Sequence, residues 1–303
     1  MSYFEPFHNV DCLIMKKFLK YIKFTIISLI LISISLLFFL FYILWKFSPQ
    51  LPSYENIINY QPNLSSRIYS SDGLILKSYF VEERIFIPIN RIPDQIKEAF
   101  ISAEDKKFYN HHGVDIVAII RAAITNLISI SSNRRVVGAS TITQQVVKNL
   151  LLTNELSYNR KIKEILLAIR IENILNKEQI LELYLNDIYL GFGSYGIGSA
   201  SLNYFNKSIN ELELHEISFL ASLPKAPNNY NPITKYNYAI ERRNWVLERM
   251  FKNGYIDKQE LKNNLKPIEI YKRKENSYNK ADYYYEEIRK NLYKEYGKNK
   301  LYS

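Results

Sequence analysis

A long apolar stretch near the N-terminus is the strongest hydrophobic pattern in the chain. Residues 24–45, "FTIISLILISISLLFFLFYILW", carry no charged side chain. As a helix, with a rise of 1.5 Å per residue, this stretch spans the roughly 30 Å hydrocarbon core of a bilayer. The pattern predicts a transmembrane helix over 24–45, with Tyr42 and Trp45 at a membrane interface. A cleaved signal peptide is disfavoured, because the apolar run is too long and no A-x-A-like site follows it.

The charges beside this stretch predict its orientation. Four lysines lie between residues 16 and 23, whereas Lys46 alone follows the stretch closely. Positive residues flanking a membrane helix favour the cytoplasmic side. We therefore expect residues 1–23 to form a cytoplasmic tail and the rest of the chain to lie outside.

The chain after residue 45 divides by composition and by period. Residues 46–65 are rich in Pro, Ser and Asn, which is typical of a linker. An Asp72-Gly73 turn between β-prone runs predicts a short β-hairpin. From Pro93 onward, apolar residues recur at helical spacing, so the pattern predicts a mainly helical domain over 66–250. The clearest helical periodicity covers residues 116–130, 161–175, 177–190 and 213–223.

Composition and charge narrow the classes of function. The chain has 303 residues, of which 47% are hydrophobic, and a formal net charge of +10. This apolar content is sufficient for a folded core. Lys and Arg are scattered and form no stripe with aromatic residues, so a nucleic-acid partner is not favoured. Cys12 is the only cysteine, which excludes an intrachain disulfide and a CxxC metal or redox site.

Residues 103–115, "AEDKKFYNHHGVD", concentrate carboxylates, histidines and aromatic side chains. Glu104 and Asp105 fall at the C-terminal end of a predicted helix, where the helix dipole tends to raise the pKa of a carboxylate. Such a group suits a general base. A second interpretation stays open from these residues alone, in which Asp105 caps the next turn and Glu104 is solvated. For His111 and His112 a structural role is favoured, because adjacent side chains point apart and do not readily share a metal.

Two later motifs supply hydrogen-bond donors and cations. "GASTITQQVVKN" places hydroxyl and amide side chains at a helix start together with Lys148, a combination suited to sugar hydroxyls and phosphate oxygens. In "NRKIKEI", helical spacing brings Arg160, Lys161 and Glu164 to neighbouring positions. Taken alone, this trio is typical of a solvated salt-bridge surface. Together with Glu104, however, Glu164 supplies the paired carboxylates that sugar chemistry uses.

Five motifs occur in one order along the chain: "EDKKFYNHHGVD", "GASTITQQ", "RKIKE", "ILELYLNDIYLGFGSYGIGSAS" and "LPKAPNNYNP". Over about residues 66–250 their order and spacing resemble the peptidoglycan glycosyltransferase domain (family 51) of class A penicillin-binding proteins. The resemblance implies a mainly α, lysozyme-like fold with a small membrane-proximal lobe and a short β-hairpin. It also implies polymerisation of lipid II, a lipid-linked disaccharide-pentapeptide, outside the bacterial cytoplasmic (inner) membrane.

The resemblance implies a role for each motif. Glu104 is expected to take the proton of the acceptor 4-hydroxyl, which attacks the anomeric carbon of the growing chain with inversion and loss of undecaprenyl pyrophosphate. Glu164 is expected to assist at the pyrophosphate, directly or through a divalent metal (Mg or Mn) whose ligands are not identified. No organic cofactor is implied. Substrate contacts are expected from Asp105, Phe108, Ser140, Thr141, Gln144, Gln145, Lys148, Arg160, Lys161 and Lys225.

The sequence departs from the family pattern at three places. Leu156 stands where similar proteins carry an Arg for the pyrophosphate, and Asn206 replaces a glycine in "YFNK". Residues 251–303 look like the lead-in to a transpeptidase domain, which we expect to be absent. The partners implied by the resemblance are lipid II, the lipid-linked growing glycan, the membrane, and a separate transpeptidase or other wall-synthesis protein.

Two other functions agree with parts of the sequence. A lysozyme-like lytic enzyme would cut glycan on the same fold, but the "STITQQ" run and the pairing of Lys161 with Glu164 favour a pyrophosphate donor. A degenerate, membrane-anchored interaction protein would agree with Leu156 and the short C-terminal segment. Against it, both Glu104 and Glu164 are present.

Overall fold

The chain forms two compact units, Met1–Pro52 and Ser53–Ser303. The computed structural model describes residues 7–52, 66–69, 75–79, 83–129, 138–152, 157–271 and 282–302. The linker that the sequence predicts over 46–65 therefore lies mostly outside the described residues.

The first unit is one long helix, α1 (Phe7–Phe47), followed by the short 3₁₀ helix η1 (Ser48–Gln50). The segment Leu19–Gln50 has a mean hydropathy of 2.8 over its most apolar window, and none of that window is buried. Among the described residues, it is the one helix whose length and composition suit a membrane span. Residues 24–45 are thus helical, as predicted, whereas their crossing of a membrane stays a prediction.

Two small sheets belong to the second unit. Strands β1 (Ser66–Tyr69) and β2 (Ile75–Tyr79) pair antiparallel, as the predicted hairpin requires, although the Asp72-Gly73 turn lies outside the described residues. Strand β3 (Glu83–Arg84) pairs in parallel with β4 (Ser194–Tyr195). The first connection is local, whereas the second joins segments far apart in the sequence.

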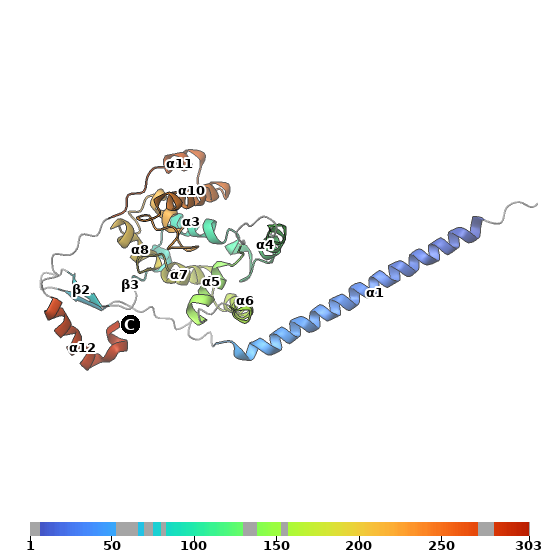
Figure 1. Ribbon diagram of the computed structural model, residues 1–303, viewed down its shortest axis with the longest axis horizontal. Helices are drawn as coiled ribbons and strands as arrows, with labels where there is room; N and C mark the ends of the chain where they lie inside the picture. Colours follow the sequence, from blue (N-terminus) through green and yellow to red (C-terminus); the bar gives the residue numbers. More distant parts are fainter. Residues whose placement is uncertain are drawn as a thin grey trace, which may run out of the picture. The chain divides into compact units, whose positions relative to one another are not determined.

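Helices form most of the second unit, so the predicted mainly α class is confirmed (Figure 1). The predicted periodic segments 116–130, 161–175, 177–190 and 213–223 each contain or overlap a helix. Among the described residues of this unit, the α-helices in chain order are α3 (Asp94–Glu104), α4 (Ile116–Ser129), α5 (Ile142–Leu151), α6 (Tyr158–Glu172), α7 (Lys177–Asp187), α8 (Gly196–Phe205), α9 (Leu214–Leu220), α10 (Tyr236–Lys252), α11 (Lys258–Asn263) and α12 (Asp282–Tyr302). The 3₁₀ helices of this unit are η2 (Ile89–Arg91) and η3 (Phe108–Asn110).

The core of the second unit is built around α3. Helices α9 and α10 pack against α3, and α5 packs against both α6 and α7. Phe100 on α3 and Tyr184 on α7 are fully buried and meet edge to face, with ring centroids 6.2 Å apart. Apolar burial of this kind is the main source of stability in a folded domain. It fixes the C-terminal end of α3 among helices that come from later parts of the chain.

Gly113 allows the loop after η3 to pack directly against α6. Its φ is +82°, a left-handed conformation that residues with a Cβ rarely adopt. A Cβ at this position would also lie 2.6 Å from the backbone oxygen of Ala168 on α6. Glycine is therefore required both by the local conformation and by the close approach of the two segments.

The substitution of Asn206 for glycine in "YFNK" is compatible with the fold. Asn206 ends α8 with φ 54° and ψ 36°, in the left-handed region. Among residues with a side chain, Asn is one of the few that adopt this conformation routinely. The helix end that a glycine would form is thus retained.

Candidate active site

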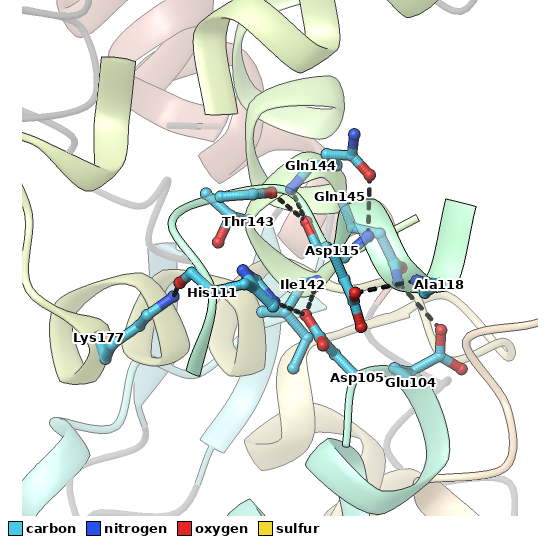
Figure 2. Close-up of polar contacts among 12 residues, drawn as sticks. Glu104, Asp105, His111, Asp115, Ala118, Ile142, Thr143, Gln144, Gln145 and Lys177 are labelled. Atoms are coloured by element: carbon cyan, nitrogen blue, oxygen red, sulfur yellow. Dashed lines mark hydrogen bonds and ion pairs between the residues drawn. The ribbon is translucent and has the colours of Figure 1, made fainter. Parts of the chain in front are cut away.

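Glu104, the last residue of α3, is half-buried beside α5. The side-chain amide of Gln145 donates a hydrogen bond of 2.9 Å to Glu104 Oε2 (Figure 2). Burial is the largest effect on this carboxyl group and raises its pKa above the ordinary value of 4.5. The Gln145 hydrogen bond and three nearby cations act in the opposite direction; the cations are Arg242, Lys225 and Lys148. A half-buried carboxylate with a raised pKa is suited to accept a proton.

Glu164 is the second predicted carboxylate, and it lies on α6. Its side chain is 3% exposed and forms an ion pair with Lys161 one turn earlier on the same helix. Lys161 Nζ also donates a 2.8 Å hydrogen bond to Ser140 Oγ, just before α5. Helix α6 and the segment just before α5 therefore place a carboxylate, an ammonium and a hydroxyl together.

The ammonium group of Lys148 on α5 is influenced by the charges of both carboxylates, Glu104 and Glu164. Burial lowers its pKa most, and the charges of Glu164 and Glu104 both raise it. Arg160 and Lys161 lie close enough to Lys148 that their like charges lower its pKa as well. Both glutamates thus act on the same ammonium group, although they are far apart in the sequence. The site combines two carboxylates with at least three cations from α5 and α6.

Asp105 connects the loop after α3 to the start of α5. Its carboxylate is buried and accepts hydrogen bonds from His111 Nε2 (2.9 Å) and from the backbone N–H of Ile142 (3.0 Å) (Figure 2). Ile142 is the first residue of α5, so the negative charge also lies at a helix N-terminus, where it is favourable. Because Asp105 follows Glu104 directly, these bonds hold the Glu104 backbone close to the helix that carries Gln145.

Three further predicted contact residues are buried inside the protein. Thr141 and Gln144 form the reciprocal capping box of α5, and Thr141 Oγ1 donates a 2.6 Å hydrogen bond to the Gly113 carbonyl. Phe108 is fully buried, with its ring edge-on to His111. These positions favour a supporting role. Direct substrate contact by Asp105, Phe108, Thr141 and Gln144 stays a prediction.

Arg160 and Lys225 approach the carboxylates from different elements. Arg160 is half-buried in the first turn of α6, near Lys148. Lys225 is exposed in the segment between α9 and α10, and its charge acts on Glu104. Both cations lie near groups of the site and could attract an anionic substrate. Substrate contact by either residue stays a prediction.

Within the described part of the chain, no group of three or more His, Cys, Asp and Glu side chains is arranged to hold a metal ion. Glu164 is paired with Lys161, and Asp105 is bonded to His111 and Ile142. These residues do not provide the cluster of oxygen ligands that Mg²⁺ or Mn²⁺ requires. The predicted divalent metal stays a prediction, and no chemical step is assigned to it.

Sequence comparison identifies the region that contains this site. Residues 72–251, more than half of the chain, match the family described as Transglycosylase. The chain belongs to the transglycosylase family. All the residues named above for the site lie inside the matched transglycosylase region.

Similar proteins extend well beyond this transglycosylase region. The chain is 48% identical over 254 residues to penicillin-binding protein 1A from Rickettsia typhi, covering 84% of this chain and 32% of that protein. It is 43% identical to penicillin-binding protein 1A from Escherichia coli, covering 81% of this chain and 28% of that protein. A crystal structure of penicillin-binding protein 1A from Haemophilus influenzae aligns with a TM-score of 0.47 and 27% identity, over 80% of this chain and 26% of that one. The chain spans about a third of the length of the curated relatives it matches.

The transglycosylase site also contains two residues to which the sequence analysis assigned no role, Arg242 and Tyr184, although Tyr184 lies inside the fourth motif. Arg242 on α10 acts on Glu104, and the phenol of Tyr184 on α7 is buried where the charges of Glu104 and Asp105 add to the effect of burial and raise its pKa. Arg242 lies in "ERRNWVLERM". The helical spacing of basic and aromatic residues in this stretch is the sequence feature that could have indicated Arg242. Leu156, the predicted departure at the pyrophosphate, lies outside the described residues.

Proposed function

We propose that the chain is a peptidoglycan glycosyltransferase that polymerises lipid II into glycan strands. The observation that carries this proposal is that the charges of Glu104 and Glu164 both act on the ammonium group of Lys148. A transfer from a diphosphate-linked sugar needs a base at the attacking hydroxyl and positive charge at the leaving group. The two carboxylates and the cations of α5 and α6 supply both. The family match supports the same class of reaction.

The chemistry follows from these groups. In the proposed reaction, the acceptor 4-hydroxyl oxygen bonds to the anomeric carbon of the growing chain while its proton moves to Glu104. The bond from that carbon to the diphosphate oxygen breaks, and undecaprenyl pyrophosphate leaves with the electron pair. Attack opposite the leaving group inverts the anomeric centre. Lys148, Arg160 and Lys161 would stabilise the charge that develops on the diphosphate.

Membrane attachment supports a lipid-linked substrate. We propose that α1 crosses the cytoplasmic (inner) membrane once, with residues 1–23 in the cytoplasm and the second unit on the periplasmic side. Helix α4 presents a second apolar surface, suited to contact with lipid. Its exposed apolar residues are Ile116, Val117, Ile119, Ile120, Ile124, Leu127 and Ile128. A transpeptidase that cross-links the product is the partner that this reaction would need.

Incubation of the membrane-anchored protein with lipid II, followed by sizing of the products, tests the proposed function. Polymerisation gives long glycan and releases undecaprenyl pyrophosphate. Parallel reactions with and without divalent metal test whether a metal is required. A lytic enzyme would instead shorten preformed strands and leave lipid II unchanged. Intact lipid II together with intact preformed glycan would contradict both enzymatic functions and favour the anchored interaction protein.

The pH dependence of polymerisation reports on Glu104. Only the deprotonated carboxylate can accept the proton, so activity should fall as the pH decreases through the pKa of Glu104, which lies above 4.5. The Gln145 hydrogen bond lowers that pKa; Gln145→Ala should therefore raise the pKa and move the acidic limb of kcat to higher pH. Asn149→Ala, an exposed amide on the same helix, serves as the control. An unchanged acidic limb in Gln145→Ala would contradict this assignment.

Lys148→Ala should weaken binding of the diphosphate end of the substrate and raise KM by about ten- to a hundredfold, since one charge-assisted contact is worth roughly 1.5–3 kcal/mol. Removal of this cation should also raise the pKa of Glu104, because Lys148 now lowers it. Steady-state kinetics at several pH values measure both effects. Lys106→Ala, an exposed lysine after Glu104, is the matched control. A change in thermal stability alone would make Lys148 structural.

A further inference from the structure

Helix α10 carries two arginines stacked on one tryptophan. The guanidinium carbon of Arg242 lies 3.8 Å from the ring centroid of Trp245, and that of Arg249 lies 5.4 Å from the same centroid. Arg242 also lies 5.9 Å from the ring centroid of Tyr230. Trp245 is 36% exposed, and both arginines are half-buried. Cation–π contacts therefore fix two guanidinium groups at an accessible surface.

The charge of Glu104 acts on Arg242, but neither Arg242 nor Arg249 forms an ion pair in the described part of the protein. No described carboxylate lies within ion-pair distance of either guanidinium, and the buried Nε of each has no hydrogen-bond partner there. The two groups also repel each other, since the charge of Arg249 lowers the pKa of Arg242. A pair of fixed, like-charged forks with unused donors is an arrangement that an anion would stabilise.

The stacked arginines belong to a different helix from the lysines of α5 and α6. Helix α10 packs against α3, which ends at Glu104, and the charge of Arg242 acts on that carboxylate. Lys148 and Lys161 belong to the other cluster, beside Glu164. Cations from both groups, Arg242 and Lys148, thus act on Glu104, and they come from different helices.

We propose that Arg242 and Arg249, held by Trp245, form a second anion-binding site that takes the diphosphate of the acceptor substrate. The inference rests on the proposed function, in which both reacting molecules are lipid diphosphates. One diphosphate leaves during the transfer, and the other stays on the acceptor. The cluster beside Glu164 is suited to the leaving group. The second site then holds the molecule whose hydroxyl Glu104 deprotonates.

Titration of the full chain in detergent with inorganic diphosphate tests this site without relying on turnover. Wild type should bind two diphosphates. The double variant Arg242→Ala/Arg249→Ala should lose one, and Lys148→Ala/Lys161→Ala should lose the other. Lys252→Ala removes a positive charge from the exposed end of α10 and should leave both. Equal stoichiometry and affinity in wild type and in the α10 double variant would overturn the proposal.

Kinetics and competition identify the group that binds. Arg249→Ala should raise KM for lipid II by about tenfold with little change in kcat, and Arg249→Lys, which keeps the charge but loses the planar fork, should recover only part of the loss.

Displacement of diphosphate from the α10 site by an acetylated peptide carboxylate at lower concentration would overturn the diphosphate assignment. Two-site binding by a wild type that does not polymerise lipid II would overturn the proposed function but retain the site. Should the alanine double variant unfold, Arg242→Lys/Arg249→Lys replaces it, and unchanged diphosphate affinity in a folded lysine variant would contradict the site.

Discussion

Glu104→Gln should reduce the rate of lipid II polymerisation by about a hundred- to ten-thousand-fold, the contribution expected of a general base. The amide has the size of the carboxyl group but cannot take a proton at neutral pH. Because Gln145 donates its side-chain N–H to Glu104 Oε2, the amide oxygen of the new side chain can accept the same bond. The fold should therefore be retained, and binding of lipid II should change little. Initial rates of glycan formation and equilibrium binding measure the two effects.

A matched control for this variant exists on the same helix. Glu98 is also half-buried on α3, and burial raises its pKa, with the charge of Asp94 adding to the effect. It lies almost two turns before Glu104, and its neutralisation by Glu98→Gln should leave the polymerisation rate within about twofold of wild type. Strand formation by Glu104→Gln at the wild-type rate would exclude Glu104 as the base.

Gly113→Ala should destabilise the second unit by about 2–5 kcal/mol. The left-handed conformation costs roughly 1–2 kcal/mol for a residue with a Cβ, and overpacking costs about 1–3 kcal/mol. The neighbouring atom is the backbone oxygen of Ala168, 2.6 Å from the added Cβ, so a side-chain rotation cannot relieve the contact. Because α6 carries Glu164, displacement of α6 should also reduce activity. Thermal unfolding should show a decrease in Tm of roughly 5–15 °C.

Gly138→Ala is the control for this loop substitution. A Cβ at Gly138 meets no described heavy atom within 4 Å, and its φ lies outside the left-handed region. Its replacement should change the free energy of unfolding by less than about 0.5 kcal/mol. If Gly113→Ala unfolds at the same temperature as Gly138→Ala, the close packing of this loop on α6 is not required for stability.

Asp105 shows the limit of motif-based prediction most clearly. The resemblance predicts that it contacts substrate, and local sequence offers only a cap for the next turn as an alternative. In the structure it does accept a bond from a helix N-terminus, but that helix is α5, which begins at Ile142. Its second partner is His111, six positions later. No local pattern shows that a carboxylate, a histidine and a distant helix start meet.

The sequence by itself determined the elements and the candidate chemistry of this protein. Apolar length predicted α1, the 3.6-residue period predicted the helices, and ordered motifs indicated Glu104 and Glu164. These features depend on short stretches of chain, which is why they can be found without a structure. Only the tertiary structure decided which side chains share a site. The approach of α10 to Glu104, the contact of Gly113 with α6, and the action of both glutamates on Lys148 arise from packing of segments that are distant in sequence.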